Sequence, residues 1–137
     1  MRVEKAYTTP LIDKLGVKPG MRAAIVGPVD PDGSFRALLA EQTADVTEGQ
    51  PLPDTDVVFL AADSRADLAA LADVRRRIRP NGAIWVISRK GRAATIRYAD
   101  VLEAAQTSGL VDNKVASFSD THTALRFVIP LALRPNG

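Results

Sequence analysis

Three short apolar runs most constrain how this chain can fold, because none of them alternates with polar residues. They cover residues 22–27, 57–62 and 83–88 and read Arg-Ala-Ala-Ile-Val-Gly, Val-Val-Phe-Leu-Ala-Ala and Ala-Ile-Trp-Val-Ile-Ser. A run of this length without alternation is typical of a strand that is buried on both faces. Such strands belong to parallel sheets with helices on both sides, so the sequence predicts an α/β protein.

Helical patterns separate these runs. Thr9 is suited to cap the start of a first helix and Gly16 to end it, while Ser34 and Ser64 are suited to cap two later helices. The segment 79–82, Arg-Pro-Asn-Gly, is expected to end the third helix and turn the chain. The predicted helices cover residues 9–16, 34–42, 64–78 and 98–108.

The last part of the chain has a different pattern. A brief strand is predicted at 45–47, and two further strands at 114–119 and 124–131 are joined only by 120–123. A four-residue connection permits only an antiparallel hairpin. We therefore expect one domain over residues 1–137, with a mostly parallel sheet and a C-terminal antiparallel β-hairpin.

The composition excludes several kinds of site. The chain has no cysteine, which excludes disulfides, thiolate metal ligands and a cysteine nucleophile, and His122 is its single histidine. No apolar run approaches the roughly 20 residues that a membrane span needs, and the N-terminal residues do not resemble a signal peptide. We expect a cytoplasmic protein with no membrane partner and no metal site.

Charge is distributed unevenly along the sequence. Residues 30–73 contain ten Asp or Glu residues and two arginines, whereas residues 75–97 contain eight Arg or Lys residues and no acid. The basic segment is either a solvated face or a surface that binds a partner. Only Trp85 and Tyr98 are aromatic in or beside it, so no nucleic-acid site is expected.

Two local motifs resemble those of class I S-adenosylmethionine-dependent methyltransferases. Residues 15–22, Leu-Gly-Val-Lys-Pro-Gly-Met-Arg, resemble the lead-in to the first strand of that family, and 78–86 resemble its proline-glycine turn into a late strand. Over nearly its whole length the chain resembles a bacterial family of short methyltransferase-like proteins of unknown function. The residues that carry this resemblance are 9–22, 83–90 and 109–128. It implies a Rossmann-like three-layer sandwich of methyltransferase-like topology.

The chain departs from the methyltransferase pattern where the cofactor is expected. Ile25 replaces an acidic residue of the first strand, and Val29 and Pro31 replace two of the three loop glycines. A Cβ atom at those positions would obstruct close approach of the backbone to a cofactor. The segment 48–56 is also too short for the helix and outer strand that the resemblance implies. We interpret the loop as degenerate.

Three residues at predicted strand ends are the candidates for a cofactor site. Gly27 ends the first strand, and Glu48 follows it by about 20 residues, the spacing at which an acid binds a ribose hydroxyl. Asp63 directly follows the second buried strand and would face the ligand crevice. The alternatives are an exposed loop position for Glu48 and helix capping beside Ser64 for Asp63.

A polar ligand could bind between the first loop and a neighbouring strand end. Asp30 and Asp32 flank that loop, and Arg89 and Lys90 follow the strand over 83–88. The alternatives are a metal held by the two carboxylates and simple turn chemistry in Asp-Pro-Asp-Gly. His122 is the candidate acid or base, with a solvent-exposed turn histidine as the alternative.

The sequence therefore favours a non-catalytic module that binds a small ligand or another protein, with no catalytic residue and no cofactor assigned. The alternative is a minimal methyltransferase that binds S-adenosylmethionine near Gly27, Glu48 and Asp63. A third reading is an accessory protein that binds its partner through residues 75–97. A homodimer is compatible with all three.

Overall fold

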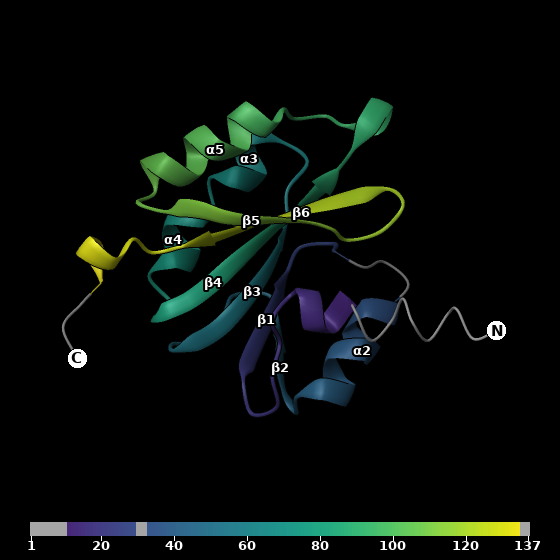
Figure 1. Cartoon of the computed structure of the whole chain (residues 1–137), viewed down its shortest axis with the longest axis vertical. Helices are drawn as coiled ribbons and strands as arrows, with labels where there is room; N and C mark the ends of the chain where they lie inside the picture. Colours follow the sequence, from purple (N-terminus) through teal and green to yellow (C-terminus); the bar gives the residue numbers. More distant parts are fainter. Residues whose placement is uncertain (1–10, 30–32, 135–137) are drawn as a thin grey trace.

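A computed structural model describes residues 11–29 and 33–134 and contains a six-stranded sheet in the order β2-β1-β3-β4-β6-β5 (Figure 1). The elements are β1 (Arg22–Val26), α2 (Ser34–Gln42), β2 (Asp45–Glu48), β3 (Thr55–Ala61), α3 (Arg65–Leu68), α4 (Leu71–Arg75), β4 (Ile78–Arg89), α5 (Tyr98–Thr107), β5 (Val111–Ser117) and β6 (His122–Val128), with 3-10 turns at Gly91–Ala93 and Leu131–Leu133. Residues 11–14 are also helical.

The three apolar runs form the centre of the sheet, as predicted. β1 pairs in parallel with β2 and β3, and β3 pairs in parallel with β4. β6 pairs antiparallel with both β4 and β5. The α/β class and the C-terminal antiparallel hairpin are therefore confirmed. β2 is an outer strand, because the short segment between β2 and β3 contains no further strand.

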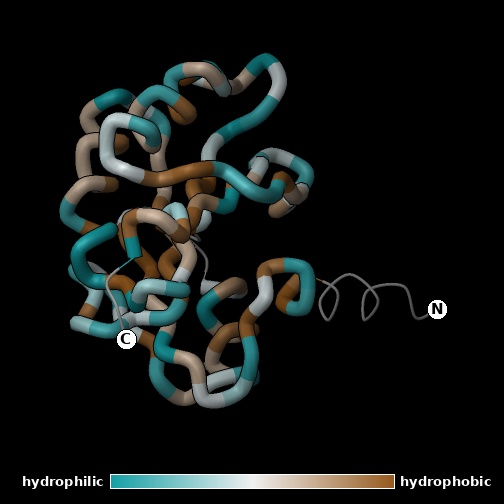
Figure 2. The backbone as a smooth tube through the Cα atoms, turned by 60° about the vertical axis from the view of Figure 1, so that its left-hand side comes forward, coloured by the Kyte–Doolittle hydropathy of each residue, from teal (hydrophilic) through white to brown (hydrophobic). Residues whose placement is uncertain are grey.

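Helices cover both faces of this sheet. Residues 11–14 and α2 lie on one side, and α3, α4 and α5 lie on the other (Figure 1). Side chains of the central strands alternate between the two layers, so that Phe59 and Trp85 belong to the layer that contains α2, while Leu60 and Val86 belong to the layer that contains α3, α4 and α5. In Figure 2 the most hydrophobic stretches run through the interior, and the connecting loops are mainly hydrophilic.

A buried hydrogen bond attaches the first helix to the sheet. The Trp85 indole Nε1 donates to the Leu15 carbonyl over 3.0 Å, and the Trp85 side chain is fully buried. A buried indole N–H that lost this acceptor would cost about 1–3 kcal/mol. The bond therefore fixes the segment that leads into β1 against the middle of β4.

Some local expectations were wrong. The helix expected over 64–78 is two short helices, because the chain turns at Ala69 and Ala70 between α3 and α4. Gly33, with φ of 81°, occupies the N-cap position of α2, so Ser34 is its first helical residue rather than its cap. The predicted cap Thr9 lies outside the described residues.

The expected turn at Arg79–Gly82 belongs to strand β4. Ile78 is in register with Thr55, and Ala83 with Val57, so four residues of β4 face a single residue of β3. The extra residues loop out of the ladder without ending the strand. The predicted turn was therefore wrong, because pairing with β3 on both sides keeps the segment within the sheet.

Replacing Gly82 by alanine should destabilise the fold. A Cβ atom there would lie 2.9 Å from the Asp56 carbonyl oxygen and 3.1 Å from the Arg79 carbonyl oxygen. We expect Gly82→Ala to lower the free energy of unfolding by about 1–3 kcal/mol, because backbone must move to make room. Urea denaturation measures this, with the exposed neighbour Asn81→Ala as control; equal stability of both variants would contradict the close approach.

Candidate functional site

The sheet topology places several of the predicted residues at one end of the sheet. The chain runs from β1 outward to β2 and returns to β3 on the other side of β1, so the switch point lies between β1 and β3. In open α/β sheets, ligands bind outside the carboxyl ends of the strands at such a point. Gly27, Asp63 and Arg89 lie at the ends of β1, β3 and β4, and we call this region the carboxyl end.

Gly27 allows β1 and β3 to end side by side. Its φ is 80°, and a Cβ atom there would lie 3.4 Å from the Ala61 Cβ. The chain then turns sharply, since the Val29 amide donates to the Gly27 carbonyl over 2.8 Å. The Val29 side chain is buried against α2, whereas Asp30, Pro31 and Asp32 lie outside the described residues.

Asp63 connects three segments at the carboxyl end. Its Oδ1 accepts a hydrogen bond from the Arg89 amide over 3.0 Å, and its Oδ2 lies 3.9 Å from the Arg89 Nε. Its carbonyl accepts from the Thr95 hydroxyl, and its amide donates to Asp67 Oδ2 over 2.9 Å. Helix α3 is capped by Ser64 instead, whose hydroxyl accepts from the Asp67 amide over 3.1 Å.

Glu48 is bound within the protein. Its carboxylate forms an ion pair with the Arg36 guanidinium of α2, although both side chains are about half exposed. The next amide, that of Gly49, donates to the Ile25 carbonyl over 2.8 Å and holds the end of β2 against β1. Glu48 therefore lies at the carboxyl end with its charge balanced by an arginine.

Lys90 and His122 lie where β4 passes beside β6. The Lys90 amide donates to the Thr121 carbonyl over 3.0 Å, and its Nζ lies 3.1 Å from the Ser117 hydroxyl. His122 is opposite Arg89 in the ladder, and its Nδ1 is 2.8 Å from the Thr121 hydroxyl. The histidine is half-buried and is the first residue of β6, which begins two residues before its predicted start, so the expected place of His122 inside the turn was wrong.

Three phenylalanines, which the sequence reading did not single out, support this region. The Phe35 ring of α2 contacts Phe59 of β3 and Phe118 of the hairpin turn, with ring centroids 4.9 Å and 4.8 Å apart in edge-to-face geometry. Their positions in the sequence are far apart, so no local signal could have joined them. They hold the β5–β6 turn against α2 across the carboxyl end.

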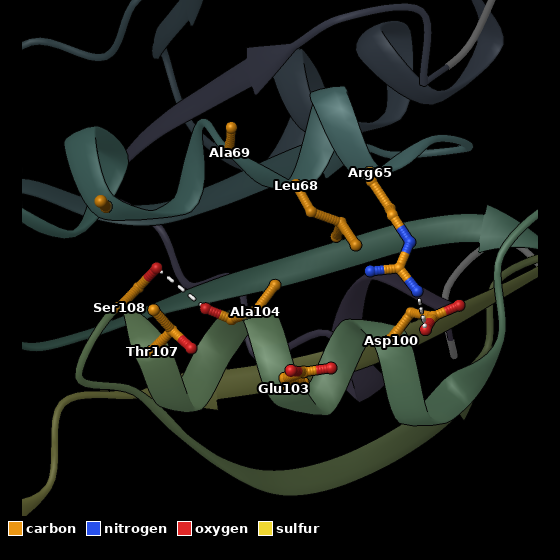
Figure 3. A pocket seen from close by; sticks show the side chains of 9 residues that line it. Arg65, Leu68, Ala69, Asp100, Glu103, Ala104, Thr107 and Ser108 are labelled. Atoms are coloured by element: carbon orange, nitrogen blue, oxygen red, sulfur yellow. Dashed lines mark hydrogen bonds and ion pairs between the residues drawn. The ribbon is translucent and has the colours of Figure 1, made fainter.

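A hollow lies between the helices on the face of the sheet opposite α2. It is a groove of about 360 Å³ with Leu68, Ala69, Ala72 and Ala104 along its apolar surface (Figure 3). Alanine side chains are too short to close the space between α3, α4 and α5. Arginines of α3 and α4 reach α5 or the residues after it on either side, through Arg65 to Asp100 and Arg75 to the Gly109 carbonyl.

Asp100 lines this groove, and its surroundings shift the pKa of its carboxyl group. The Arg97 amide donates to its Oδ2 over 3.0 Å, which lowers the pKa of the carboxyl below its ordinary value. The guanidinium groups of Arg97 and Arg65, 3.5 Å and 3.0 Å from Oδ1, lower the pKa further against the opposing effect of burial. These contacts join the start of α5 to α3.

In the described part of the chain, no three metal-binding side chains come together, and no helix is long and apolar enough to cross a membrane. At the carboxyl end, Glu48 instead pairs with Arg36, and Asp63 with Arg89. Chemically, this arrangement can hold polar groups of a ligand.

Solved structures of methyltransferases have the same fold. A SAM dependent methyltransferase from Aquifex aeolicus aligns over 89% of this chain and 89% of its own, with TM-score 0.63 and 15% identity. A TehB-like SAM-dependent methyltransferase from Corynebacterium glutamicum aligns over 89% and 86%, with TM-score 0.59 and 15% identity. Fibrillarin from Aeropyrum pernix, solved with natively bound S-adenosyl-L-methionine, aligns over 90% and 74%, with TM-score 0.59 and 14% identity.

At the level of sequence, the profile of a family described as "Protein of unknown function (DUF3052)" matches residues 13–130. No curated protein matches the sequence. The family match thus covers residues 83–90 and 109–128 and most of 9–22, the three segments that carry the resemblance in the sequence.

Asp63→Ala should weaken the join between β3 and β4. The variant loses the acceptor of the Arg89 amide, and we expect unfolding to require about 0.5–1.5 kcal/mol less free energy. Chemical denaturation measures the change. Asp63→Asn keeps a carbonyl oxygen at this place and should retain most of the stability; an equal loss in both variants would mean that the charge, not the hydrogen bond, carries the effect.

Asp100 should make stability depend on pH in the acid range. Because its folded-state pKa is lowered, its contribution is present above the ordinary aspartate pKa and is lost as the pH falls through the lowered value. Asp100→Asn should flatten the pH dependence of the melting temperature below pH 4. The exposed Glu103→Gln on the same helix is the control, and an unchanged profile in Asp100→Asn would refute this assignment.

Proposed function

The chain belongs to the DUF3052 family of proteins of unknown function, and from its methyltransferase-like fold we propose a non-catalytic Rossmann-like module that binds a small ligand at the carboxyl end. Arg89 and Lys90 are the proposed ligand-binding residues, with Asp30 of the first loop as a further candidate outside the described residues. The proposal treats residues 1–137 as one domain that acts in the cytoplasm without a bound cofactor.

The observation that carries this proposal is that both candidate acids are engaged within the chain. The Arg36 guanidinium occupies Oε2 of Glu48, so a ribose that bound both carboxylate oxygens would share that acceptor with it. Asp63 uses Oδ1 and its backbone groups to hold β4, Thr95 and Asp67 in place. A nucleoside cofactor would therefore share both carboxylates with contacts that already stabilise the fold, and this favours a module that does not bind one.

The second candidate is a minimal methyltransferase that binds S-adenosylmethionine. It is supported by the alignment over nearly all of the Aquifex aeolicus methyltransferase and by Gly27, whose positive φ lies at the topological switch point. In that case Gly27, Glu48 and Asp63 would hold the cofactor, and its sulfonium methyl group would supply the transfer chemistry.

A protein partner or a homodimer on the basic segment has less support. Arg76 and Arg77 pair with Asp73, and Arg79 pairs with Asp56 over 3.0 Å. Much of the charge of residues 75–79 is thus balanced within the chain, which favours the reading as a solvated face. Nucleic acid is not proposed as a partner.

Titration with S-adenosylmethionine and S-adenosylhomocysteine separates the first two candidates. We expect no change of melting temperature at 1 mM of either compound. A ligand present at one hundred times its Kd would stabilise the protein by about 2.7 kcal/mol, which differential scanning fluorimetry detects readily.

The matched variants are Glu48→Gln at the carboxyl end and Glu41→Gln on the exposed side of α2. A saturable stabilisation that disappears in Glu48→Gln and persists in Glu41→Gln would refute the non-catalytic proposal and establish the cofactor site. Calorimetric titration of the unmodified protein checks that any thermal shift reflects binding.

A further inference from the structure

Hydrogen-bond donors gather at one place on the carboxyl end, where β4, β5 and β6 lie side by side. Lys90 follows β4, Ser117 ends β5, and Thr121 and His122 lead into β6. The Lys90 Nζ lies 3.1 Å from the Ser117 hydroxyl, and the Thr121 hydroxyl is 2.8 Å from the His122 Nδ1. An ammonium, two hydroxyls and an imidazole thus come from adjacent strands.

The positive charge of this cluster is not balanced within the described part of the chain. There, Lys90 has no carboxylate within ion-pair distance, and its ammonium contacts only a neutral hydroxyl. Arg92 in the following 3-10 turn forms no ion pair with any described residue either. The acid nearest to the Arg89 guanidinium is Asp63 at 3.9 Å, and Asp120 in the turn pairs with none of these described cations.

Ring packing and hydrogen bonds hold the turn between β5 and β6 in place. Phe118 packs against Phe35 of α2, and the Ser119 hydroxyl accepts from the Thr121 amide over 3.3 Å and the His122 amide over 3.1 Å. The Lys90 amide bond to the Thr121 carbonyl joins the turn to β4. The backbone of these segments therefore needs little reordering before a ligand binds. The Ser117 hydroxyl, which donates to the Ser119 carbonyl over 3.3 Å, would turn toward the ligand.

Resting on the proposed ligand-binding function, we propose that the ligand is a small phosphate monoester whose phosphate group binds between Lys90 and the Ser117 and Thr121 hydroxyls. A phosphate monoester carries up to two negative charges and three acceptor oxygens. These match an ammonium and two hydroxyl groups better than a single carboxylate would.

Titration of the ¹⁵N-labelled full chain with inorganic phosphate and with glycerol 3-phosphate tests this proposal, at constant ionic strength set by chloride. We expect saturable amide shifts confined to residues 89–92 and 117–122, with glycerol 3-phosphate binding at least as tightly as inorganic phosphate. Lys90→Gln should weaken binding about tenfold or more, since a hydrogen bond to a charged group contributes about 1.5–3 kcal/mol.

Lys18→Gln is the control, because Lys18 is an exposed lysine in the turn before β1. The spectra themselves report whether each variant is folded. Equal shifts with acetate, equal affinity in Lys90→Gln, no saturable shift, or binding of inorganic phosphate without glycerol 3-phosphate would each overturn the assignment of a phosphate monoester.

Failure here is distinct from failure of the proposed function. A protein that binds neither phosphate nor S-adenosylhomocysteine refutes only the ligand class. Binding of S-adenosylhomocysteine that depends on Glu48 refutes the non-catalytic module, whatever the result with phosphate.

Discussion

The rest of the structure depends on strands that are apolar on both faces. β1, β3 and β4 cannot expose either side to water, so helices must cover the sheet twice. Right-handed connections between parallel strands supply those helices and bring the strand ends to one side of the molecule. The place where a ligand can bind therefore follows from how the core is buried.

The fold alone does not imply that the acids at the carboxyl end are paired within the chain, as they are in this molecule. Glu48 lies at the end of β2, where a ribose-binding acid would be, but Arg36 one helix earlier neutralises it. Asp63 lies at the end of β3 and holds β4 in place. Both acids thus hold segments of the protein together, and Lys90 and Arg92 are the cations at this end that have no acidic partner among the described residues.

The likeness to methyltransferases is a likeness of architecture. The same sheet order accommodates different ligands, because function depends on the side chains at the strand ends rather than on the strands. In this chain β2 is the outer strand, and the loop after β1 directs Val29 into the core. The groove between α3, α4 and α5 is a separate hollow on the far layer, closed in by arginine contacts (Figure 3).

The sequence by itself determined the buried strands, helices α2 and α5, and the hairpin. These elements depend on local periodicity and on the length of one connection. It also placed Gly27, Glu48 and Asp63 at strand ends. It could not determine that Arg36 pairs with Glu48, that Phe118 packs on Phe35, or that residues 79–82 stay in β4. Only the tertiary structure decided these, because each is a contact between segments whose approach is set by sheet register and packing rather than by neighbouring residues.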